Sequence, residues 1–237
     1  LSSALLVIIG LCIRLKLHET PAFLKVLDEQ KEVNIPFKIV VTQHFPMLVL
    51  GTIAAICTFV VFYLTTVFAL NWGTTKLGYA RSEFLQLQLV ATLCFAAFIP
   101  LSAVFAEKFG RKATSIGVCI ASALFGLVFA SMLESGSTWM VFLFLCTGLA
   151  LMGMTYGPIG TVLSEIFPTS IRYTGSALTF NLAGIFGASF APLIATKLAT
   201  EYGLYAVGYY LSAASILSLL AFLMIRETKH DDVNNQL

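Results

Sequence analysis

The stretch P-L-S-A-V-F-A-E-K-F-G-R-K, residues 100–112, decides the fold of this chain. Four charged residues surround its glycine, and a long apolar run lies on either side of them. Each run is long enough to cross the hydrocarbon core of a bilayer, which takes about 20 residues of α-helix. A short, charged turn between two such runs indicates a loop that joins two membrane-spanning helices.

The composition of the whole chain is also that of a membrane protein. Hydrophobic residues make up 58% of it and charged residues 11%, whereas a soluble domain carries about 25% charged residues. The net charge of +2 is too small to indicate nucleic-acid binding. The five cysteines lie in separate apolar runs without a C-x-x-C motif, so we expect no metal site, disulfide framework or cofactor.

Six apolar runs are long enough to span the membrane, and none alternates polar and apolar residues as a barrel strand does. They cover residues 45–70, 85–105, 114–133, 138–163, 173–197 and 205–225. Backbone polar groups must be paired within the bilayer. We therefore expect an all-α membrane protein with a six-helix bundle over residues 44–225. The shorter run 1–13 is expected to be the end of a further transmembrane helix.

Basic residues are divided unevenly between the two sides of this predicted bundle. Segment 14–43, loop 106–113, the turn at Arg172 and the tail 226–237 hold eleven of the fourteen Lys and Arg residues. The positive-inside rule places these segments, and with them the C-terminus, in the cytoplasm. Within the connecting loop 14–43, residues 22–32 fit either an amphipathic helix on the membrane surface or a solvated linker.

An apolar helix followed by a basic residue and Glu-Thr occurs twice, ending at Thr20 and at Thr228. Six predicted spans separate the two copies, so both lie on the same side of the membrane. This spacing suggests a structural repeat of about 200 residues, as in transporters built from parallel repeats. The alternative is a chance similarity between two short segments. A true repeat would make this chain the second half of a duplicated protein.

A second charged pattern is S-E-I-F-P-T-S-I-R-Y-T-G, residues 164–175. Glu165 ends one predicted span and Arg172 begins the next. A carboxylate and a guanidinium at adjacent helix ends can form a charge-assisted pair. We expect this pair to reach Arg111 and Glu227 in a ring at the cytoplasmic side.

These charged positions form a candidate cytoplasmic gate, which closes the inner side in one state and opens it in another. Its members are Glu107, Gly110, Arg111, Lys112, Glu165, Arg172 and Glu227. The basic loop alternatively serves only as a topology signal. The acidic–basic pair alternatively is an ordinary interfacial ion pair, worth at most about 1 kcal/mol when exposed.

Several segments together resemble the metabolite–proton symporter family of the major facilitator superfamily. They are F-Y-L-T-T-V-F-A-L-N-W-G-T-T-K-L-G (62–78), the loop 100–112, E-I-F-P-T-S-I-R-Y-T-G-S-A-L-T-F-N-L-A (165–183), A-P-L-I-A-T (191–196) and R-L-K-L-H-E-T-P-A-F (14–23). The resemblance covers nearly the whole chain. It implies the C-terminal half of a twelve-helix fold, from the end of helix 6 to helix 12.

The loop 100–112 resembles the G-x-L-x-D-R-x-G-R-R signature of that superfamily, with departures. Ala103 stands for the leading Gly, Phe105 for Leu, Glu107 for Asp and Lys108 for Arg. Such weakening is expected of a second-half copy. Phe180 also stands at a position that is often Tyr in the family, so no relative's substrate is carried over.

The resemblance implies that helices 7, 8, 10 and 11 face a central cavity. Polar side chains on these helices are candidates for substrate binding, because polar groups in a membrane must find partners or line water. These candidates are Tyr63, Thr66, Gln88, Thr92, Tyr156 and Asn181. Hydrogen bonding between helices is the alternative. Small residues at every fourth position from Gly175 to Ala191 predict a sliding or packing face on helix 11.

These observations predict a secondary active transporter that works by alternating access, a proton-coupled symporter of a small organic carboxylate or zwitterion. A proton-independent uniporter or exchanger and a transporter-like solute sensor are the alternatives. No nucleophile with a base, metal cluster or phosphate-binding loop occurs, so we do not expect an enzyme. No ionisable residue lies in the middle of a complete span, which places any titrating group in the missing half.

The expected partners are a small-molecule substrate, protons, the lipid bilayer and the missing N-terminal six-helix half, with no nucleic acid. The expected location is the bacterial inner membrane, as a multi-pass protein.

Overall fold

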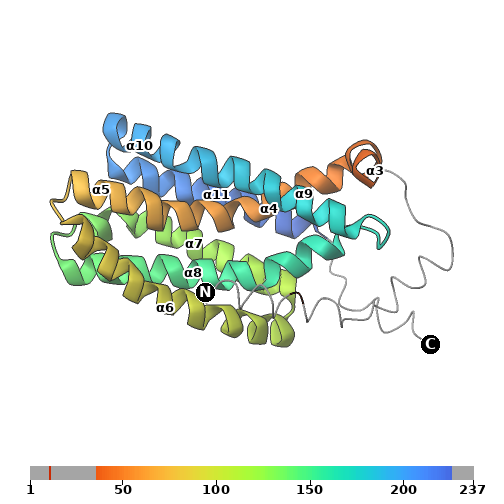
Figure 1. The fold of residues 1–237 in the computed structure, drawn as a ribbon, viewed down its shortest axis with the longest axis horizontal. Helices are drawn as coiled ribbons and strands as arrows, with labels where there is room; N and C mark the ends of the chain where they lie inside the picture. Colours follow the sequence, from red (N-terminus) through yellow and green to blue (C-terminus); the bar gives the residue numbers. More distant parts are fainter. Residues whose placement is uncertain (1–10, 12–35, 226–237) are drawn as a thin grey trace.

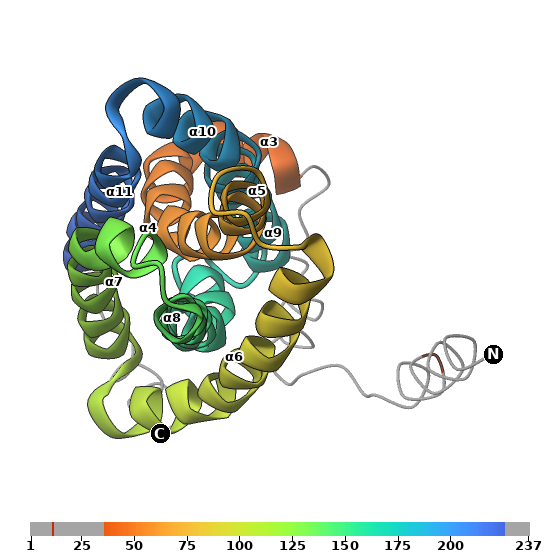
Figure 2. The same cartoon turned by 90° about the vertical axis from the view of Figure 1, so that its left-hand side faces the viewer.

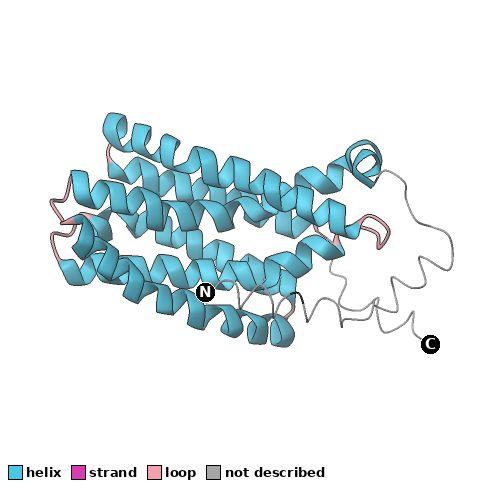
Figure 3. Ribbon diagram, in the orientation of Figure 1, coloured by secondary structure: helices cyan, strands magenta, loops and turns pink. Residues whose placement is uncertain are grey.

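The computed structural model describes residue 11 and residues 36–225. All regular structure in these residues is helical (Figure 3). Six helical spans are long and apolar enough to cross a membrane: Phe45–Thr75, Arg81–Phe109, Arg111–Leu133, Thr138–Glu165, Arg172–Tyr202 and Leu204–Met224. The prediction of an all-α protein with six spans is confirmed. The predictions for the surface helix at 22–32, the Glu-Thr repeat and Glu227 lie outside the described residues.

Two of the spans are made of three helical segments, because a short π-helix interrupts each of them. The elements are α3 (Pro36–Gln43), α4 (Phe45–Tyr63), η1 (Leu64–Phe68), α5 (Ala69–Thr75), α6 (Arg81–Phe109), α7 (Arg111–Leu133), α8 (Thr138–Glu165), α9 (Arg172–Gly184), η2 (Ile185–Ser189), α10 (Phe190–Tyr202) and α11 (Leu204–Met224). The π-helices η1 and η2 lie in the first and fifth spans. The sequence gives no signal for either of them.

The spans run side by side along the long axis of the bundle (Figure 1). One end carries α3, the turn at Gly110, the loop 166–171 and the last residues of α11; we call it the basic end. The opposite end carries the turns between α5 and α6, α7 and α8, and α10 and α11. In the described residues, the basic end holds five basic and two acidic residues, and the opposite end three of each.

Glycine and proline set the ends of several helices. Gly110 has φ of 95° and separates α6 from α7, while Gly203 has φ of 84° and separates α10 from α11. Both lie in the left-handed region, which a residue with a Cβ adopts only with strain. Pro46 occupies the first turn of α4, where its missing N–H removes no helical hydrogen bond.

The helix α4 lies inside the bundle, where it packs against α8, α9 and α11 (Figure 2). Small residues let the helices approach closely. A Cβ on Gly126 of α7 would lie 3.0 Å from the backbone nitrogen of Ser212 in α11. The Ser212 hydroxyl donates a hydrogen bond to the carbonyl oxygen of Ala123, at 2.7 Å. The α7–α11 pair is therefore held by close backbone packing and an interhelical hydrogen bond.

The small residues predicted at every fourth position of the fifth span form a packing face. All five members are buried: Gly175, Thr179, Ala183, Gly187 and Ala191. A Cβ on Gly187 would lie 2.7 Å from the Cβ of Phe59 in α4. Only glycine therefore permits the observed approach of η2 to α4.

The helix α3 lies within the segment 14–43, for which the sequence predicts a connecting loop. Val40 of α3 is completely buried, in an apolar cluster with Leu48 of α4 and with Phe167 and Ile171 of the loop 166–171. This part of the connection is thus fastened to the basic end of the bundle.

Candidate functional site

The described charged residues of the candidate gate lie at the basic end, and Glu107, Arg111 and Lys112 flank the turn between α6 and α7. Gly110 is buried, and its carbonyl oxygen accepts hydrogen bonds from the backbone N–H and the hydroxyl of Thr114. Glu107 and Lys108 are exposed on the last turn of α6. The Lys108 ammonium lies 5.3 Å from the ring centroid of Phe109, within the range of a cation–π contact.

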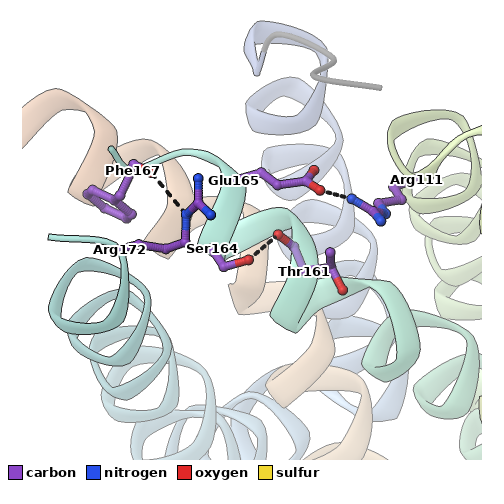
Figure 4. A network of polar contacts seen from close by, with 6 residues as sticks. All are labelled: Arg111, Thr161, Ser164, Glu165, Phe167 and Arg172. Atoms are coloured by element: carbon purple, nitrogen blue, oxygen red, sulfur yellow. Dashed lines mark hydrogen bonds and ion pairs between the residues drawn. The ribbon is translucent and has the colours of Figure 1, made fainter. Parts of the chain in front are cut away.

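Arg111 forms an ion pair with Glu165 (Figure 4). Arg111 is the first residue of α7 and Glu165 the last residue of α8, so the pair joins two spans at the basic end. Their side chains are 46% and 27% exposed. The pair is therefore partly screened by water, and its net stabilisation is on the order of 1 kcal/mol.

Arg172, the first residue of α9, contacts the loop that precedes it. Its Nε donates a 3.5 Å hydrogen bond to the carbonyl oxygen of Phe167 (Figure 4). The Phe167 ring lies against Gly175 on the first turn of α9. Of the four charges predicted to form a ring, Arg111 and Glu165 are paired, and Arg172 donates to the backbone of the loop between α8 and α9. Glu227 lies outside the described residues.

Lys112 binds a different helix from its neighbour Arg111. Its Nζ donates hydrogen bonds to the carbonyl oxygens of Leu223, at 2.9 Å, and Ile225, at 2.6 Å. These carbonyls lie at the C-terminal end of α11, where backbone acceptors have no partner within the helix. The sequence shows a basic residue two positions after Gly110 but does not reveal these acceptors, which lie more than 100 residues away along the chain.

The candidate cavity residues lie on the first, second, fourth and fifth spans, as the resemblance implies. Gln88 of α6 and Thr66 of η1 are brought together, because Gln88 Nε2 lies 2.8 Å from the carbonyl oxygen of Thr66. Thr66 and Thr92 donate their hydroxyls to backbone carbonyls one turn earlier in their own helices. Tyr63 is half-buried next to Phe62, with ring centroids 5.3 Å apart.

The other two candidates lie on separate helices. Tyr156 of α8 is 44% exposed, and its ring centroid is 5.9 Å from that of Phe95 in α6. Asn181 is exposed on α9, where its Nδ2 donates to the carbonyl oxygen of Ala177 at 2.8 Å. Phe95 is an aromatic neighbour of Tyr156 that the pattern of polar residues in the sequence does not identify.

A hollow of about 310 Å³ lies between α6 and the start of α8, lined by Leu87, Val90, Thr138, Trp139 and Phe142. It contains none of the candidate cavity residues. Its lining is almost wholly apolar, which gives it no group that would orient a polar solute.

A bundle of six apolar spans, with uncharged polar groups within the spans and an ion pair across one end, is typical of half a secondary transporter. The chain belongs to the Major Facilitator Superfamily, whose sequence model matches residues 1–182 and, in a second match, residues 52–236. The predicted superfamily is therefore confirmed.

Curated relatives are transport proteins. The chain is similar to the inner membrane metabolite transport protein YhjE of Escherichia coli, with 43% identity over 236 residues, which are 98% of this chain and 54% of that protein. A putative metabolite transport protein of Haemophilus influenzae is 38% identical over 243 residues, covering 98% and 56%. The citrate-proton symporter of Klebsiella pneumoniae is 27% identical over 180 residues, covering 75% and 40%.

The chain spans about half the length of the Escherichia coli and Haemophilus influenzae proteins. The names of the relatives agree with the expectation that the chain is not part of an enzyme. No solved structure matches the chain significantly.

Proposed function

We propose that the protein to which this chain belongs is a secondary active transporter that moves a small organic carboxylate or zwitterion together with protons. The observation that carries this proposal is the combination of two features in one bundle. Uncharged hydroxyl and amide groups lie within the spans, and the Arg111–Glu165 pair joins α7 to α8 at one end. Such a bundle supplies polar side chains within the membrane for solute binding and a closure that can break.

Alternating access requires a second bundle, which rocks against this one around a site near the midplane. The high exposure of α6 supports the presence of a second bundle. In its most apolar stretch only 11% of the residues are buried, against 56% for the span that contains α4. We propose that the remaining half of the protein covers the side of α6 that bears Gln88 and Thr92, while lipid covers the rest.

The charges favour one orientation of the bundle. Short loops rich in Lys and Arg stay in the cytoplasm, and the described basic end carries the excess of basic residues. We therefore place the basic end and the C-terminus in the cytoplasm of a bacterial cell, with the bundle in the inner membrane. The Arg111–Glu165 pair is then part of a cytoplasmic gate.

Uptake by the purified full-length protein in proteoliposomes tests the function. A panel of labelled citrate, 2-oxoglutarate, shikimate, proline and glycine betaine is offered with an inward proton gradient, without one, and with a protonophore. Uptake of one class of solute that collapses with the protonophore supports proton symport. Equal uptake under all three conditions would instead show a uniporter or exchanger. Binding without flux would show a solute sensor.

A further inference from the structure

The π-helix η1 leaves one backbone carbonyl of the first span without its usual donor. In an α-helix, the N–H of Ala69 would donate to the carbonyl oxygen of Thr65, four residues earlier. Here the N–H of Ala69 donates to the carbonyl oxygen of Leu64, five residues earlier, and to that of Thr66, three residues earlier. The carbonyl oxygen of Thr65 therefore does not receive the N–H of Ala69, in a part of the chain where water does not replace the lost bond.

Gln88 reaches across from α6 to these carbonyls. Its side-chain nitrogen lies 2.8 Å from the oxygen of Thr66 and 3.4 Å from that of Thr65. Both partners are carbonyl oxygens, which only accept hydrogen bonds, so the amide nitrogen of Gln88 must face them. Gln88 thus donates mainly to the carbonyl oxygen of Thr66 and makes a longer contact with that of Thr65, so the neighbouring span holds the π-turn at two consecutive carbonyls.

The widened turn is also confined from a second side. Thr65 is completely buried, and its hydroxyl finds no hydrogen-bond partner among the described residues. A Cβ on Gly148 of α8 would lie 3.0 Å from the Cβ of Thr65. A buried hydroxyl without a partner is unfavourable. The π-turn η1 is therefore in close contact with both α6 and α8.

We propose that Gln88 is a positioning residue for transport: its amide holds the π-turn and so fixes Tyr63 and Thr66 on the wall of the candidate cavity. This role rests on the proposed function, since it presumes that this wall contacts solute. The nitrogen of Gln88 is committed to the first span, so Gln88 acts on the solute through its neighbours.

Hydrogen–deuterium exchange tests the positioning role without any solute. The full-length protein is compared with the variants Gln88→Met, which keeps the side-chain length but removes the donor, and Thr92→Val, which removes a hydroxyl one turn away that bonds only to the backbone of Gln88. We expect amide exchange over residues 64–69 to rise about tenfold in Gln88→Met and to stay unchanged in Thr92→Val. Unchanged exchange in Gln88→Met overturns the proposal.

Uptake kinetics separate positioning from direct contact. Positioning predicts that KM rises by the same factor for every transported solute, about fivefold for the loss of one hydrogen bond. Direct contact predicts a loss only for solutes that carry a group reaching Gln88, and that result also overturns the proposal. If Gln88→Met does not fold, Gln88→Asn, whose amide is one methylene shorter, should shift both readouts in the same direction. If the unaltered protein transports nothing, the proposed function fails, while the exchange experiment still decides the role of Gln88.

Discussion

Arg111, the first residue of α7, forms an ion pair with Glu165, the last residue of α8. The two residues are 54 positions apart in the sequence, yet both lie at the basic end of the bundle. A pair that joins two helix ends resists their separation, and its partial exposure allows water to replace it when the ends move apart. This combination suits a gate that must open in every transport cycle.

Breaking this ion pair should impair transport, and rebuilding it with reversed charges should restore it. We expect Arg111→Gln and Glu165→Gln each to lower the initial rate of uptake by the full-length protein. The exchange Arg111→Glu with Glu165→Arg should recover most of that rate, with a coupling free energy of about 1 kcal/mol. The control is Lys108→Gln, which removes a basic residue of the same loop. A reversed pair no better than the single variants would contradict the gate.

Lys112 should stabilise the protein through the C-terminal end of α11. Removing its ammonium leaves the carbonyl oxygens of Leu223 and Ile225 without this donor. We expect Lys112→Met to lower the free energy of unfolding by about 1–2 kcal/mol, seen as a lower Tm in detergent. Lys108→Met serves as the control, because the ammonium of Lys108 lies over an exposed ring. Equal Tm values for the two variants would refute the role of Lys112.

The contact between α7 and α11 should depend on one glycine of α7 and not on another. A Cβ on Gly126 would meet the backbone of α11, whereas a Cβ on Gly117 would meet no heavy atom of another helix within 4 Å in the described part of the chain. We expect Gly126→Ala to destabilise the protein by about 1–3 kcal/mol through overpacking. Gly117→Ala should be neutral or stabilising by up to about 1 kcal/mol, because alanine favours a helix. The Tm values of both variants, measured by thermal unfolding, test this prediction. A lower Tm for Gly117→Ala than for Gly126→Ala would show that α7 and α11 pack differently.

Docking of α3 should protect the loop between α8 and α9. Val40 is completely buried against this loop, while Phe37 of the same helix is 57% exposed. We expect Val40→Asp to increase hydrogen exchange over residues 166–171, because an unpaired carboxylate cannot remain in the apolar cluster. Phe37→Asp carries the same charge on the exposed side and should leave exchange unchanged. The two variants giving the same profile would show that α3 does not hold the loop.

The helical class, the six spans and the charged loops follow from the sequence because hydropathy and charge position are properties of single segments. The run of apolar residues on each side of Gly110 is enough to place α6 and α7 in the membrane. The residue types at the basic end can also be predicted from the sequence, since positive charges collect on one side of a membrane protein.

The partners of those residues could not be predicted, because they depend on how segments distant in sequence pack. The sequence predicts Lys112 at the gate, but its hydrogen-bond acceptors are the backbone carbonyls of Leu223 and Ile225 at the end of α11. The sequence predicts that Gln88 contacts solute, but its side-chain nitrogen donates to the π-turn η1, which no sequence pattern predicts. The helix α3 was overlooked because its eight residues are too few to show a helical period clearly.

The residue that couples transport to protons should lie outside this chain. No Asp, Glu, His, Lys or Arg lies in the middle of any of the six spans, and membrane-embedded ionisable residues usually form proton relays. We therefore expect that neutralising the membrane-embedded acidic residues of the other half, one at a time, identifies a variant that exchanges solute but no longer accumulates it under a proton gradient. Glu165→Gln, measured in parallel, should slow uptake yet leave the accumulation ratio unchanged, because the role proposed for Glu165 is in the gate and not in proton coupling. Proton-driven accumulation that survives neutralisation of every such acid would place the coupling group elsewhere.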